Sequence, residues 1–173
     1  MRVTFELEPS DIKRFHEALT RAQKMVQCAD EADVIEAAKH ALDALSIASA
    51  PNYVRQRVVQ VQRLIVMLED DAWSLPKAER DDVVETLVYF SDPEDMIPDD
   101  LSVIGLLDDA IMLELLLRRM RHVLQAYEDF CAHRTELRGS GTRIEQAKAL
   151  AKKRAALHER MRRRRRRGEL AAL

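Results

Sequence analysis

Apolar residues recur at spacings of three and four along much of the N-terminal half, and this periodicity constrains the fold more than any other feature of the chain. It forms three consecutive stripes. The stripes are Ile12, Phe15, Leu19, Ala22 and Val26; Val34, Ala38, Ala41, Leu45 and Ala48; and Val54, Val58, Val61, Ile65 and Leu68. Such spacings place side chains on one face of an α-helix, and short connections between helices favour antiparallel packing. The sequence therefore predicts an antiparallel helical bundle.

The residues before the first stripe follow a different period. Val3, Phe5 and Leu7 alternate with polar residues, which is the pattern of a β-strand with one apolar face. A single strand leaves backbone groups unpaired, so it needs a partner, and a second copy of the chain would supply one in a homodimer. The predicted fold class is therefore all-α with one short N-terminal β-strand and a basic C-terminal helical extension.

The second half of the chain contains further helical segments. A fourth helix is predicted from about Lys77 to Phe90, and a long one runs from Leu106 with a buried side that reaches Phe130. Trp73 lies in the turn before the fourth helix and is expected to anchor that turn to the core. We predict a bundle over residues 1–138, a flexible break at 139–142 and a basic extension over 143–173.

The charge is distributed unevenly along the chain. Residues 1–117 hold 11 Lys and Arg against 24 Asp and Glu, whereas residues 118–173 hold 17 against 6. The chain has two cysteines and no apolar leader, which predicts a cytoplasmic protein. It has no uncharged apolar stretch long enough to cross a bilayer, so no transmembrane segment is predicted. Peripheral attachment to a membrane remains an alternative.

A motif rich in aspartate and proline separates the fourth and the long helix. Its positions are Tyr89, Pro93, Asp95, Ile97, Pro98, Asp99, Gly105, Asp108 and Asp109. The motif resembles that of the YkvA-like family, a bacterial domain of unknown function, and the resemblance covers residues 78–117. It implies a small helical domain, which in some relatives carries membrane segments. It implies no established activity, substrate or cofactor.

The motif residues have a structural interpretation of their own. Ser91 and Glu94 have the spacing of a capping box, Pro93 suits a first helical turn, and Pro98 forces Ile97 towards an extended conformation. Gly105 permits a positive φ or a close backbone approach. The motif would then be a rigid connection between two helices.

An alternative interpretation of the motif is a divalent-cation site. Asp95, Asp99, Asp108 and Asp109 would supply the oxygen ligands that magnesium or calcium prefers. Asp108 and Asp109 also suit the first turn of a helix, where carboxylates complement the helix dipole, and the spacing matches no EF-hand. No other cofactor is predicted.

A run of six arginines near the C-terminus is the strongest functional feature outside the motif. The run consists of Arg162, Arg163, Arg164, Arg165, Arg166 and Arg167. It would bind nucleic acid or anionic lipid without sequence specificity, form a solvated tail, or lie against the acidic part of its own chain or of a neighbouring one.

Three functions follow from these features. Because no complete catalytic constellation is present, the first prediction is a non-enzymatic interaction or scaffold protein with an unknown protein partner. The second is binding to nucleic acid or an anionic membrane through the arginines. The third is a divalent-metal-dependent enzyme that uses the four aspartates.

Overall fold

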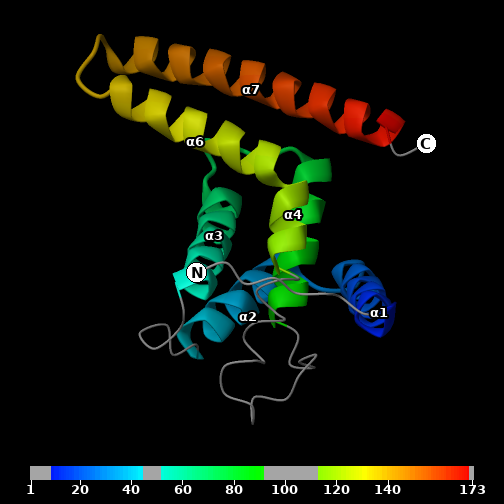
Figure 1. Cartoon of the computed structure of the whole chain (residues 1–173). Helices are drawn as coiled ribbons and strands as arrows, with labels where there is room; N and C mark the ends of the chain where they lie inside the picture. Colours follow the sequence, from blue (N-terminus) through cyan, green and yellow to red (C-terminus); the bar gives the residue numbers. More distant parts are fainter. Residues whose placement is uncertain (1–8, 45–51, 92–112, 172–173) are drawn as a thin grey trace.

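The computed structural model describes residues 9–44, 52–91 and 113–171, and every regular element in these ranges is a helix (Figure 1). The helices are α1 (Pro9–Val26), α2 (Glu31–Ala44), α3 (Asn52–Glu69), α4 (Lys77–Ser91), α6 (Arg121–Glu136) and α7 (Arg143–Ala171). Residues 113–119 form a further helical segment before α6. None of the helices in these ranges is long and apolar enough to cross a bilayer.

The predicted fold class requires one correction. The all-α part of the prediction is confirmed. The predicted β-strand is wrong, because every regular element in the described part of the chain is a helix. A strand is stable only beside another strand, and the described elements offer no sheet edge with which it could pair. Val3, Phe5 and Leu7, which suggested the strand, lie outside the described residues.

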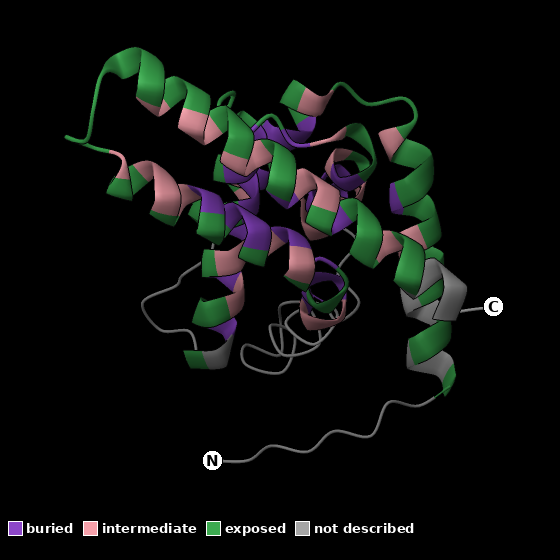
Figure 2. Cartoon of the chain, turned by 90° about the horizontal axis from the view of Figure 1, so that it is seen from above, coloured by how far each residue is buried: buried purple, intermediate pink, exposed green. Residues whose placement is uncertain are grey.

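The helices form two layers. Helices α1 and α2 both pack on α4, and α3 contacts α2, α4 and α6. Helices α6 and α7 form an antiparallel pair that lies across the upper ends of α3 and α4 (Figure 1). Buried residues lie mainly on the inner faces of the helices, while much of α7 is exposed (Figure 2).

The predicted apolar stripes account for most of the lower layer. Val54, Val58, Val61, Ile65 and Leu68 are all buried on α3. The first stripe is wrong at its start, because Ile12 is 46% exposed at the N-terminal end of α1. Helix α1 packs on α4, but the packing does not cover Ile12. The periodicity of a helix therefore does not reveal how far along its length a neighbouring helix covers it.

The helix predicted to run to Phe130 is interrupted at Met120. Met120 has φ −93° and ψ 4° and precedes the first residue of α6, and α6 turns away from the segment 113–119 (Figure 1). The buried side nevertheless continues across the bend, since Leu117, Met120 and Val123 are all buried. Sequence periodicity therefore does not show the bend.

Trp73 anchors the connection between α3 and α4, as predicted. Its side chain is 0% exposed, and its ring centroid lies 5.7 Å from that of Tyr127, 4.9 Å from Phe130 and 4.5 Å from His158. The first two rings belong to α6 and the third to α7. One turn residue therefore joins both helices of the upper layer to the lower one.

Asp70 fixes the same connection through polar contacts. Its Oδ1 accepts hydrogen bonds from the amides of Ala72 at 3.1 Å and Trp73 at 3.2 Å. Its Oδ2 accepts one from the Tyr127 hydroxyl at 2.9 Å and one from Arg134 Nη1 at 2.8 Å. Burial raises the pKa of Tyr127, and the bond to Asp70 adds to this, so the phenol remains protonated.

Helix α7 reverses direction after α6 and packs along it. Gly139 and Gly141 adopt φ +85° and +73°, which favours glycine in this turn. Thr142 and Glu145 then form a capping box, in which Glu145 Oε2 accepts from the Thr142 amide at 2.8 Å. Leu157 and Met161 of α7 are buried in the common core, and Arg154 Nη1 donates to the Ala72 carbonyl at 3.0 Å.

His158 makes this packing sensitive to pH. Burial and, to a smaller extent, the charges of Arg154 and Arg162 lower the pKa of His158 to about 4, although a hydrogen bond to the Trp73 backbone acts in the opposite direction. The unfolded chain binds a proton near pH 6.5, whereas the folded protein does not until about pH 4. The free energy of unfolding should therefore fall as the pH decreases between these values.

We expect the substitution His158→Gln to remove this component. Urea unfolding of both proteins at pH 7, 6 and 5 would measure it, with the wild type losing more stability than the variant as the pH falls. The variant retains His122, whose pKa is also lowered, chiefly by burial. The difference between the two proteins therefore reports the contribution of His158. Parallel pH profiles for the two proteins would contradict the expectation.

Candidate functional site

Of the motif residues predicted from the sequence, the structure describes Tyr89. It lies on α4, is half-buried and packs against the core. The others lie outside the described residues. These are Pro93, Asp95, Ile97, Pro98, Asp99, Gly105, Asp108 and Asp109. Within the described ranges, no three side chains of the kinds that bind metals gather in one place. The cation site in the motif therefore stays a prediction.

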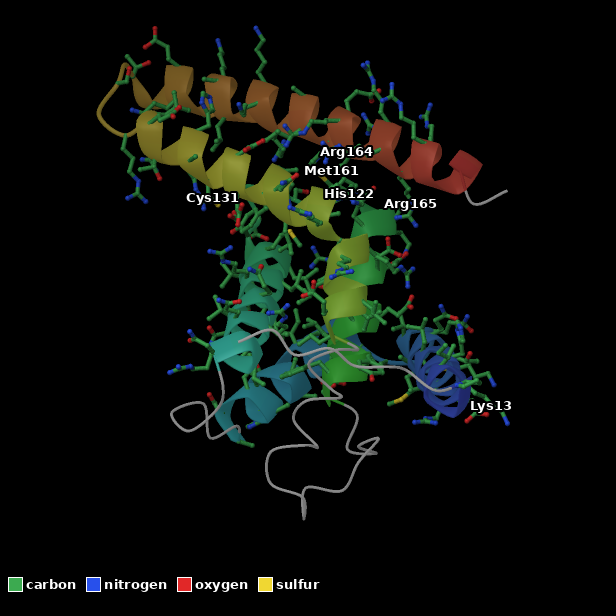
Figure 3. All side chains as sticks on the ribbon, viewed as in Figure 1. Lys13, His122, Cys131, Met161, Arg164 and Arg165 are labelled. Atoms are coloured by element: carbon green, nitrogen blue, oxygen red, sulfur yellow. The ribbon has the colours of Figure 1, made fainter. Side chains whose placement is uncertain are left out.

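The six arginines belong to the last turns of α7, and helix geometry divides them into two sets. Two of them face the rest of the molecule (Figure 3). Arg165 Nη1 lies 2.7 Å from Asp82 Oδ2 on α4, and Arg164 Nη1 donates to Gln125 Oε1 on α6 at 3.4 Å. These contacts hold the C-terminal part of α7 against its own chain.

Like Arg164, the other four arginines are exposed, and helix geometry places them away from the face of α7 that carries the buried Met161. They are Arg162, Arg163, Arg166 and Arg167, which we call the outer arginine face. Arg162 and Arg163 share Glu159, at 2.7 and 3.0 Å. Their hydrogen bonds lower the pKa of Glu159. Because one carboxylate serves two arginines, the face retains an excess of positive charge.

A hollow of about 480 Å³ lies beside this face. Its lining consists of Ala156, Glu159, Arg160, Arg163, Arg164 and Arg167. Arg160 Nη2 is held by Asp129 Oδ2 of α6 at 2.6 Å. Four guanidinium groups with planar sets of N–H donors therefore surround a space that is open to solvent, an arrangement suited to oxyanions.

A second concave region lies where α3 meets the bend before α6. We call it the polar cleft; its volume is about 790 Å³. It is lined by Gln56, Arg57, Gln60, Glu114, Leu117, Arg118, Arg121, Leu124, Gln125 and Glu128. Sequence reasoning missed this region. The basic run from Arg118 to Arg121 was a signal for it, but the bend that exposes the run has no signature in the periodicity.

The acidic residues of the polar cleft are already paired. Glu114 lies 2.6 Å from Arg57 Nη2 and 2.9 Å from Arg118 Nε, and Glu128 lies 2.6 Å from Arg63 Nη1. Burial raises the pKa of Glu114, but the contacts with Arg118 and Arg57 outweigh burial, and the net shift is downward. Glu114 is therefore ionised, and each of the two carboxylates of the cleft is paired with arginine.

One buried carboxylate stands apart from both regions. Glu79 is 2% exposed in the first turn of α4, and its Oε1 has no hydrogen-bond partner in the described part of the chain. Its nearness to the N-terminus of α4 stabilises a negative charge. Glu79 lines neither the hollow nor the polar cleft. This carboxylate is therefore part of neither of the two hollows described above.

One comparison with known proteins gives a match. Residues 83–115 match the model of a family described as "Protein of unknown function (DUF1232)". The matched segment begins within α4 and includes the motif rich in aspartate and proline. Over this segment the chain is similar to an uncharacterised family of helical domains. No curated protein and no solved structure matches the chain.

Proposed function

We propose that the protein is a non-catalytic binding module with a YkvA-like core, and that its outer arginine face binds the phosphate backbone of nucleic acid. The family match over residues 83–115 covers the motif that suggested the YkvA-like resemblance, and this overlap supports the first part. The arrangement of the arginines on α7 supports the second part and is the observation on which the proposal rests.

The arginine run is part of an ordered helix. Arg164 and Arg165 are directed to Gln125 and Asp82, which fixes the orientation of α7 and directs the four remaining arginines outward. Arginine binds phosphate oxygens through two parallel N–H donors, and a helix that is already oriented loses less conformational entropy on binding than a mobile tail.

Exposed basic residues extend the outer arginine face along α7. Lys148 and Lys152 are exposed and stand at helical spacing from Arg163 and Arg167. At 1.5 Å per residue, the distance from residue 148 to residue 167 is about 28 Å. A basic line of this length suits an extended polyanion. The acidic first part of the chain would repel the same polyanion and so favour approach from the α7 side.

The exposed surface of α7 favours nucleic acid over a lipid surface. A helix that lies in a membrane interface needs an apolar face as well as basic residues. In the described part of α7, the large apolar side chain of Ile144 is strongly exposed, at 69%, but it lies at the opposite end of the helix from the arginines. The outer arginine face thus has the charge for an anionic surface but lacks an apolar face.

Replacing the four outer arginines with glutamine should weaken binding to nucleic acid. The variant is Arg162→Gln, Arg163→Gln, Arg166→Gln and Arg167→Gln in the full chain. Fluorescence anisotropy with duplex DNA between 50 and 200 mM KCl would give the slope of log affinity against log salt. We expect the magnitude of this slope to fall by roughly three to four, because each phosphate contact contributes about 0.9.

A matched variant removes four positive charges far from α7. It carries Lys13→Gln, Arg21→Gln, Lys24→Gln and Arg55→Gln, all at exposed positions on α1 or at the start of α3. This control should retain the wild-type slope. Equal losses in the two variants would show that net charge alone determines binding, and tighter binding to anionic vesicles than to DNA would contradict the choice of nucleic acid.

A further inference from the structure

We propose that the polar cleft between α3 and the bend at Met120 binds a small phosphate monoester. This second site is independent of the outer arginine face, because its lining comes from α3, the segment 113–119 and α6 rather than from α7. The argument rests on which hydrogen-bonding groups in the cleft remain available to a ligand.

The acceptors of the cleft are largely occupied by protein groups. Both carboxylate oxygens of Glu114 are engaged, Oε2 by Arg57 and Oε1 by Arg118. Glu128 Oε1 accepts from Arg63. The side-chain oxygens of Gln56 and Gln125 accept from Arg57 and Arg164, both at 3.4 Å.

Arg57 and Arg118 donate to Glu114, but other donors of the cleft remain available. In the described part of the chain, Arg121 makes no ion pair, and Gln60 makes no hydrogen bond. Because Gln56 and Gln125 use their oxygens as acceptors, their amide NH₂ groups remain to donate. Free donors in excess of free acceptors select a ligand that is rich in acceptors, and a phosphate group presents three terminal oxygens.

The electrostatics and the size of the cleft agree with this ligand. Arg121 is the first residue of α6, and it adds a positive charge to the lining of the cleft. A volume of about 790 Å³ is within the range of small-molecule sites. Leu117 and Leu124 provide apolar contacts for the organic part of a monoester.

Thermal unfolding and calorimetry with the full chain would test the proposal. The probes are adenosine monophosphate, inorganic phosphate and succinate, which separate a phosphate monoester from a free phosphate and from a dicarboxylate. At about ten times its Kd, adenosine monophosphate should raise Tm by roughly 3–5 °C. Inorganic phosphate should bind more weakly at the same place, and succinate should give the smallest shift.

Substitutions would locate the binding. Arg121→Gln and Gln60→Ala should each weaken the binding of adenosine monophosphate, and the loss for Arg121→Gln should be about tenfold or more. Neither variant should lower Tm in the absence of ligand, because neither side chain has an intramolecular partner in the described part of the chain. The four-arginine variant of α7 should keep the wild-type affinity, so this proposal and the nucleic-acid proposal can fail separately.

Three results would overturn the proposal. The first is the absence of any Tm shift with adenosine monophosphate or inorganic phosphate at millimolar concentration. The second is a shift of equal size with succinate, and the third is a shift that persists in Arg121→Gln. Either of the last two would show that the anion binds without the phosphate-selective donors of the cleft.

Discussion

Replacing Trp73 with alanine should reduce the free energy of unfolding by about 3–5 kcal/mol, the largest effect expected for a single substitution in this protein. The indole is 0% exposed and contacts rings on both α6 and α7. Its removal would leave a cavity at the junction of the two layers, where the surrounding helices cannot close without moving apart from their other contacts. Urea unfolding followed by circular dichroism would measure the loss.

Two further variants make this expectation specific. Trp73→Phe retains an aromatic ring and removes an indole N–H that has no hydrogen-bond partner in the described residues, so its cost should be clearly smaller. Val66→Ala, at a position that is 55% exposed, should have almost no effect.

Hydrogen exchange would show where Trp73→Ala acts. We expect the amides of α7 to lose more protection than those of α2, because the Trp73 ring packs directly against His158 of α7, whereas α2 packs on α4. A loss of stability below about 1 kcal/mol, or a uniform loss of protection, would contradict the role assigned to Trp73.

Replacing Asp70 with alanine should have the second-largest effect, about 2–4 kcal/mol. The substitution removes the acceptor of two turn amides and leaves the Tyr127 hydroxyl and the Arg134 guanidinium without their partner. The Asp70 side chain is 11% exposed and that of Arg134 is 35% exposed, so water can only partly replace the lost contacts. Urea unfolding at neutral pH is the appropriate measurement.

A double-mutant cycle would separate the contributions of Asp70. Tyr127→Phe removes one hydroxyl and should cost about 1–2 kcal/mol in the wild type but almost nothing when Asp70 is already alanine. Asp70→Asn keeps an acceptor for the turn amides and should be intermediate. If the Tyr127→Phe cost is the same in both backgrounds, the hydrogen bond between Asp70 and Tyr127 contributes no stability.

The lower layer of the fold was largely predictable because its determinants are local. Val83, Val84, Leu87 and Val88 were expected to face inward on the fourth helix, and all four are buried. The position of Trp73 in the core was also predicted, since a large apolar ring beside a turn has few other places to go. Such predictions need only the period of a helix and the size of a side chain.

The candidate sites were only partly predictable. The arginine run was visible in the sequence, but its division into two sets was not, because that depends on where α7 docks. Arg165 and its partner Asp82 are 83 residues apart, and Arg164 and Gln125 are 39 apart. The polar cleft depends on the bend at Met120, across which the buried stripe continues unchanged.

The sequence by itself determined the all-α class within the described residues, the inward faces of α3 and α4, and the separation of an acidic first part from a basic last part. Only the tertiary structure decided which arginines face outward and which side chains line the polar cleft. The physical reason is that helix periodicity and net charge are sums over neighbouring residues. Each site is instead formed by side chains that come together only when α6 and α7 pack on the end of the lower layer.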